Sequence, residues 1–264
     1  MKQGTRALVL LIYAAVVFNT SFSLYADTST AENLKRLKRA DSNWTYMEND
    51  FSAEYTIVQE IPEKGKSVTE AALFRRDRQD IYTIVILEPE EDRGQGYLKK
   101  GETLWVYDPE SDKFNTTSSQ ERFQNSNAKN SDFTKSTLAE DYKILSVTPV
   151  KLGQYEAFLY ELESDKSGVT YPYMKAWITD DGRILKTEDY SRSRRLLRVT
   201  AVPEYQRIKS KNIPKKIYII DMLEGSRIDG EFINERTIIT IANPSFKPVP
   251  DIVFSKAFLR RMRK

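Results

Sequence analysis

The chain of 264 residues carries 41 Lys and Arg against 38 Asp and Glu, and it contains neither histidine nor cysteine. Its formal net charge of +3 gives no global attraction for nucleic acid. The missing residue types exclude Ser-His-Asp triads, cysteine nucleophiles, disulfide bonds and His- or Cys-based metal sites, so stability must come from a packed core.

The N-terminus is typical of a secretion signal. Lys2 and Arg6 precede an apolar run over residues 7–18, which has signal-peptide length and is too short to span a bilayer. Small residues follow, and Ala26 is the expected last residue before cleavage. We therefore expect residues 1–26 to be removed and residues 27–264 to form the mature protein; an uncleaved anchor is the alternative.

A short amphipathic helix is predicted at the start of the mature chain. A capping-box pattern begins it at Ser29, and Leu37 and Trp44 fall on its apolar face. Asp41 interrupts that face, which predicts that the helix ends near Ala40. A helix of this length is stable only when it packs against a larger element.

From Phe51 onward, apolar and polar residues alternate with a period of two, which is typical of half-buried strands. Turns rich in Gly, Pro and Asp separate the apolar runs, and no helix alternates with the strands as a parallel sheet would require. The sequence therefore predicts a mainly β (α+β) fold with one strongly curved antiparallel sheet that forms an unclosed barrel. The expected strands are residues 51–57, 68–75, 81–87, 96–99, 103–107, 113–117, 142–150, 154–163, 173–179, 184–190, 196–202 and 216–222, with one or two more between 228 and 241.

Two segments break the strand pattern. Residues 118–135 are rich in Ser, Asn and Gln and are too long for a routine hairpin loop. They lead into residues 131–134 and 138–142, which are predicted to form one or two short helices. Residues 250–259 are predicted to form a final helix, and we expect the helices to cover the concave face of the sheet.

Charged residues offer no complete site. Asp108, Glu110 and Asp112 alternate like the start of a calcium loop, but the Gly and Glu that such a loop needs later are missing. The acids of residues 88–92 could hold a glycosidase pair, although a solvated turn is the plainer interpretation. We therefore predict no metal, no cofactor and no catalytic residue.

Basic residues gather in three places. These are residues 35–39 on the first helix, Arg192 to Arg198, and Arg260 to Lys264. Each group is interpreted as a solvated face, and contact with anionic headgroups or an acidic partner is the alternative.

Apolar and aromatic side chains are abundant on the predicted strands, and the chain has 15 Tyr, 12 Phe and 3 Trp. They either fill an ordinary core or line a cavity that an incompletely closed sheet keeps on its concave face. The residues alone leave this choice open. The candidate lining residues are Phe74, Ile84, Ile86, Leu98, Trp105, Tyr107, Phe133 and Leu138.

The order and spacing of several motifs resemble the outer-membrane lipoprotein-sorting proteins, relatives of the periplasmic lipoprotein carrier LolA. The resemblance covers essentially the whole mature chain, and the segment RFQNSNAKN before Ser131 departs from the family pattern. The motifs are Pro89-x-x-Asp92-Arg93-Gly94-x-Gly96-Tyr97-Leu98, Leu104-Trp105-Val106-Tyr107-Asp108-Pro109, Ser131-Asp132-Phe133-Thr134, Asp141-Tyr142 and the closing Val253-Phe254-Ser255-Lys256.

The resemblance implies a LolA-like unclosed barrel in the periplasm whose apolar concave face binds acyl chains. Helices around residues 32–39 and 132–142 would open to admit a lipid and close over it. The protein would be a non-catalytic monomer that accepts lipoproteins or lipids from an inner-membrane transporter and delivers them to an outer-membrane acceptor. The alternatives are an accessory protein of an ABC- or RND-type exporter with another hydrophobic cargo, a structural β-domain with a filled core, and a carboxylate-based hydrolase.

Overall fold

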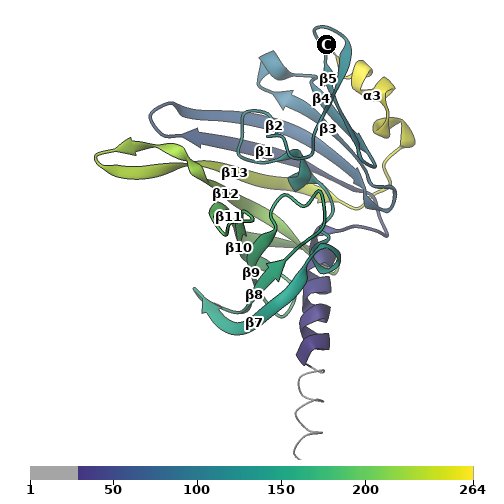
Figure 1. Cartoon of the computed structure of the whole chain (residues 1–264). Coiled ribbons are helices and arrows are strands. Elements are labelled where there is room, and N and C mark those ends of the chain that lie inside the picture. Colours follow the sequence, from purple (N-terminus) through teal and green to yellow (C-terminus); the bar gives the residue numbers. More distant parts are fainter. Residues whose placement is uncertain (1–28, 264) are drawn as a thin grey trace, which may run out of the picture.

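Residues 29–263, which the computed structural model describes, form one antiparallel sheet of 13 strands (Figure 1). The strands are β1 (Phe51–Ile61), β2 (Gly65–Arg76), β3 (Ile81–Glu88), β4 (Gly96–Lys100), β5 (Thr103–Asp108), β6 (Lys113–Thr117), β7 (Lys143–Leu152), β8 (Tyr155–Glu163), β9 (Tyr173–Ile178), β10 (Ile184–Tyr190), β11 (Leu196–Ile208), β12 (Lys211–Ile228) and β13 (Glu231–Ser245). Their order is β6-β5-β4-β3-β2-β1-β13-β12-β11-β10-β9-β8-β7, so β6 and β7 are the two edges and the sheet curves without closing. The predicted fold class is confirmed, and the predicted signal sequence lies outside the described residues.

The strands lie where the alternation of the sequence predicts them, but β1, β2, β12 and β13 are longer than expected, and the largest difference lies around residues 203–216. Here β11 and β12 continue as one long hairpin through Pro203 and Pro214. The pairing register shifts between Ala201 and Glu204, which removes Pro203 from the regular ladder of hydrogen bonds. Proline is rare inside strands, and the sequence therefore predicted a shorter hairpin.

The N-terminal helix spans residues 29–44 among the described residues, so it continues past the predicted end at Ala40. Its buried Leu37 and Ala40 pack on the concave face of β8–β10. Gly182 allows this contact, because a Cβ atom there would lie 2.7 Å from the carbonyl carbon of Arg39. Among residues 29–263, no helix is both long and apolar enough to cross a membrane.

The basic residues of this helix are only partly solvated, which corrects the sequence interpretation. Arg36 is buried, and its guanidinium donates to Asp180 at 3.0 Å and to the hydroxyl of Tyr160 at 3.2 Å. The same group lies 3.6 Å from the centre of the Phe158 ring. Arg36 therefore fixes the helix to the sheet rather than facing solvent.

The C-terminal segment covers the opposite, convex face of the sheet. It forms two short helices, η4 (Asp251–Phe254) and α3 (Lys256–Arg261), instead of the single predicted helix. Ser255 separates them, and its hydroxyl caps α3 by accepting the N–H of Phe258 at 3.1 Å. Leu259 of α3 packs over Gly96, where a Cβ atom would lie 2.4 Å from its side chain. Gly96 therefore permits close packing of α3 on the sheet.

The polar segment of residues 118–137 crosses the concave face. It contains η3 (Asn130–Phe133) and leads into α2 (Leu138–Asp141), which confirms the two predicted short helices. Phe123 is fully buried, and its ring lies 4.7 Å from that of Tyr97 and 4.5 Å from that of Phe133. Residues 118–133 therefore fill the concave face over β1–β5, and the N-terminal helix covers the concave face of β8–β10.

Candidate functional site

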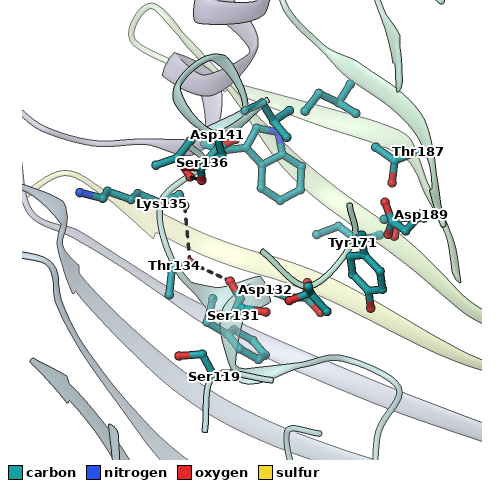
Figure 2. Close-up of a pocket in the computed structure, with 18 of the residues that line it drawn as sticks. Ser119, Ser131, Asp132, Thr134, Lys135, Ser136, Asp141, Tyr171, Thr187 and Asp189 are labelled. Atoms are coloured by element: carbon teal, nitrogen blue, oxygen red, sulfur yellow. Dashed lines mark hydrogen bonds between the residues drawn. The ribbon is translucent and has the colours of Figure 1, made fainter. Parts of the chain in front are cut away.

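A cavity of about 500 Å³ lies on the concave face, between β9–β13 and the segment that crosses above them. We call residues 130–142, which include η3 and α2, the flap. Figure 2 shows the flap residues Ser131, Asp132 and Ser136 facing Thr187 and Asp189 across the cavity. The volume falls within the range of roughly 300–1,000 Å³ that is usual for small-molecule sites.

The floor of the cavity is mostly apolar. Ile217 and Ile219 of β12 and Ile239 and Ile241 of β13 face it, because side chains two residues apart share one face of a strand. Val202 of β11 extends this surface. Further apolar and aromatic side chains complete the lining; they include Trp44, Tyr46, Tyr55, Phe133, Leu138, Tyr142, Met174 and Ile184.

One end of the floor is polar. Arg198 of β11 donates from Nε to Oδ2 of Asp189 at 2.8 Å and from Nη1 to both carboxylate oxygens of Asp132 at 2.9 Å. Its guanidinium also lies 4.8 Å from the centre of the Tyr171 ring. Burial raises the pKa of the Asp189 carboxyl above its ordinary value, although the charge of Arg198 opposes this. Arg198 therefore links the floor to the flap.

The other end of the flap is held by the N-terminal helix. Asp41 accepts the N–H of Leu138 on Oδ1 and the N–H of Ala139 on Oδ2, both at 2.8 Å. Its Oδ1 also accepts the hydroxyl of Ser136 at 2.6 Å. Burial raises the pKa of Asp41, and these hydrogen bonds act against that rise. Asp41, which interrupts the apolar face of the helix in the sequence, thus serves as an N-cap for α2 from another element.

The structure brings two of the eight candidate lining residues to the cavity, Phe133 and Leu138 of the flap. Ile84 and Ile86 lie on the concave face but are buried beneath the segment of residues 118–133, together with Phe123. They belong to the packed core and do not line the cavity.

The other four candidates lie on the convex face. Leu98, Trp105 and Tyr107 pack with Leu259 of α3, and Phe74 packs against η4. Successive residues of a strand face opposite sides of the sheet. The direct neighbours of these four residues in their strands face the concave side, so the four themselves face the convex side. Their predicted facing is thus corrected, and they take no part in the function proposed below.

Sequence reasoning missed the polar end of the cavity. It placed Arg198 in a solvated group with Arg192, Arg194 and Arg195. The side chains of those three residues are indeed exposed. Arg198 instead is held by two carboxylates at the cavity. The alternation of side chains along the strand could have revealed this contact. It places Arg198 on the same face of β11 as Val202, which is buried.

Within residues 29–263, no group of three or more acidic side chains is arranged to hold a metal ion. The described cavity can bury apolar groups next to the ion pairs that Arg198 forms with Asp132 and Asp189. This arrangement can hold an elongated apolar molecule with a polar end.

A family model described as "-like: Uncharacterized protein" matches residues 78–261, which is more than half of the chain. The chain belongs to that family. No curated protein sequence matches the chain significantly.

Several solved structures share the fold of this chain. A LolA superfamily protein from Nitrosomonas europaea has a TM-score of 0.69 and 23% identity, with 85% of this chain and 97% of that chain covered. A domain described as an outer membrane lipoprotein-sorting protein domain from Vibrio parahaemolyticus has a TM-score of 0.73 and 16% identity over 86% and 98% of the two chains. A DUF1329 family protein from Desulfovibrio piger has a TM-score of 0.72 and 18% identity over 87% and 98%. The chain therefore has the LolA-like unclosed barrel fold.

Proposed function

We propose that the protein is a periplasmic carrier that binds acyl chains of lipoproteins or lipids in the cavity and moves them toward the outer membrane. Residues 27–264 act as a non-catalytic monomer between an inner-membrane transporter and an outer-membrane acceptor, after removal of residues 1–26. A domain of the same fold is described as an outer membrane lipoprotein-sorting protein domain, which supports this proposal.

The apolar floor beneath the flap carries the proposal. Isoleucines of β12 and β13 line a cavity of about 500 Å³, where they can shield an acyl chain from water. Each methylene group that is removed from water contributes about 0.8 kcal/mol, so a partly buried chain gives useful affinity and still permits release.

The attachment of the flap supports loading and unloading. Asp41 holds one end and the Arg198–Asp132 ion pair holds the other, and both connections are polar. Polar contacts exchange with water at little net cost, at about 0.5–1.5 kcal/mol per hydrogen bond. Residues 134–142 of the flap can therefore open while Phe133 stays packed against Phe123 and Tyr55 in the core.

The proposal is tested by extracting lipid from the protein after purification from the periplasm, followed by mass spectrometry. We expect acyl lipids or acylated peptides to copurify with the wild-type protein. Ile217→Trp places an indole in the cavity and should reduce the bound lipid roughly tenfold, equivalent to about 1.4 kcal/mol.

Tyr218→Trp is the matched control. Tyr218 is the next residue on β12 and faces the convex side, where the Arg236 guanidinium lies 5.8 Å from its ring. This variant should keep its bound lipid. Equal lipid content in both variants, or the absence of lipid from the wild-type protein, would contradict the proposal.

A further inference from the structure

The polar end of the cavity is confined to two strands. In the pairing of β10 with β11, Thr187 lies opposite Thr200 and Asp189 lies opposite Arg198, and all four side chains line the cavity. The neighbouring strand β12 places Ile219 opposite Thr200. A compact polar patch therefore adjoins the apolar floor, and an elongated ligand can contact both at once.

Two polar atoms of this patch, both able to accept a hydrogen bond, have no hydrogen-bond partner within residues 29–263. They are Oδ1 of Asp189, whose side chain is completely buried, and Oγ1 of Thr200. The hydroxyl of Thr187 lies beside Asp189 in Figure 2 and acts to lower the pKa of the Asp189 carboxyl, but it makes no hydrogen bond with Oδ1. An unpaired buried polar atom destabilises the folded protein, and such atoms call for a functional explanation.

The charge balance of the patch disfavours an anion. Arg198 is shared by Asp132 and Asp189, so one guanidinium faces two carboxylates. Lys129 lies near the patch, with its Nζ over the Tyr171 ring at 5.5 Å, but it does not line the cavity. Among the other cations that line the cavity, Arg75 is paired with Asp77 and Lys99 with Asp80. Within this patch, the unpaired atoms are thus a carboxylate oxygen and a hydroxyl that can both accept a hydrogen bond; the unpaired indole N–H of Trp44 lies elsewhere in the cavity lining.

We propose that the carrier selects amphiphiles whose polar head group donates hydrogen bonds, as a hydroxyl or a primary ammonium does. The head group contacts Asp189 and Thr200, and the acyl chain extends over the isoleucines of β12 and β13. This inference rests on the proposed function and adds a substrate class to it.

The test compares four ligands that share a twelve-carbon chain, measured by calorimetry with the delipidated full-length mature protein. Dodecanol and dodecylamine carry donors, whereas dodecyltrimethylammonium is a cation without a donor and laurate is an anion. We expect the two donors to bind about tenfold more tightly than the other two, equivalent to about 1.4 kcal/mol.

Two variants locate the selectivity. Thr200→Val removes one unpaired atom with little change of shape, so it should reduce the preference for dodecanol and leave the unliganded protein as stable or more stable. Asp189→Asn removes the charge and should abolish the preference for dodecylamine over laurate. Thr240→Val on β13, whose side chain is outside the cavity, is the control and should change no affinity.

The possible failures are distinguishable. Equal affinity for all four ligands would overturn head-group selection and leave acyl-chain binding intact. Selectivity that persists in both Thr200→Val and Asp189→Asn would also overturn the inference, because the contacts would then lie elsewhere. Absence of binding for all four ligands would overturn the proposed function together with the inference.

Discussion

Asp50 joins three segments that are distant in the sequence. Its carboxylate accepts hydrogen bonds from the Arg76 guanidinium at 3.0 Å and from the N–H of Val249 at 2.9 Å, and it pairs with Arg78 at 2.8 Å. Burial by itself raises the pKa of Asp50, but these hydrogen bonds outweigh burial and hold the pKa below its ordinary value of 3.8. The ionised carboxylate therefore stabilises the fold.

This linkage predicts a pH-dependent effect of Asp50→Asn. A lowered folded pKa gives stability that is present above the unfolded pKa of 3.8 and is lost as the pH falls through the folded pKa. We expect the variant to lose about 3 kcal/mol of unfolding free energy at neutral pH, as the breaking of buried ion pairs usually costs. The difference from the wild-type protein should shrink below pH 3.8 in urea denaturation followed by circular dichroism.

Asp251→Asn is the control for this measurement. Asp251 pairs with the same Arg76, but its side chain is 91% exposed. An exposed pair contributes at most about 1 kcal/mol, so this variant should stay close to the wild-type stability. A deficit of Asp50→Asn that remains constant down to acid pH would contradict the role given to its charge.

The facing of single residues was the least predictable feature of the sequence. Leu98, Trp105 and their neighbours alternate as a strand should, and the strand was located correctly. However, both Tyr97 and Leu98 are buried, because residues 118–133 cover one face of β4 and α3 covers the other. When both faces of a strand are apolar, alternation does not reveal which face adjoins the cavity.

At the scale of elements, the flap depends on contacts between segments far apart in the chain. The sequence located its short helices, since their local patterns are helical. It did not reveal the burial of Phe123 and residues 126–128, because this depends on Gln59 and Thr237, which accept the N–H of Asn127 at 3.1 Å and 2.7 Å. The cap that Asp41 provides to α2 is likewise a long-range contact.

The cap predicts how the flap responds to Asp41→Ala. Loss of the carboxylate leaves the N–H groups of Leu138 and Ala139 without their acceptor. A lost N-cap costs about 1 kcal/mol, so amide exchange over residues 136–142 should become about fivefold faster. Hydrogen exchange with mass spectrometry measures this directly.

Asp180→Ala serves as its control, because Asp180 contacts Arg36 on the same helix but not the flap. This variant should leave exchange in the flap unchanged. Exchange that rises equally in β10–β13 after Asp41→Ala would mean that Asp41 supports the whole sheet rather than the flap.

At the scale of the whole molecule, the concave face is divided into two halves with different roles. Over β1–β5 it is filled by Phe123 and Phe133 against the core, and over β9–β13 it keeps a cavity of about 500 Å³. Sequence patterns predicted the curved sheet because every hairpin has local signals. They did not predict the division, because that depends on how one irregular segment packs across the sheet.

The central claim is that an acyl chain occupies this cavity, and Trp44 provides its most direct test. Trp44 lines the cavity, whereas Trp105 and Trp177 do not. In the variant Trp105→Phe/Trp177→Phe, a fatty acyl chain carrying bromine should quench the fluorescence of the remaining Trp44. In Trp44→Phe, the same chain should leave the fluorescence of the other two unchanged. Quenching of Trp105 and Trp177 without quenching of Trp44 would contradict the account.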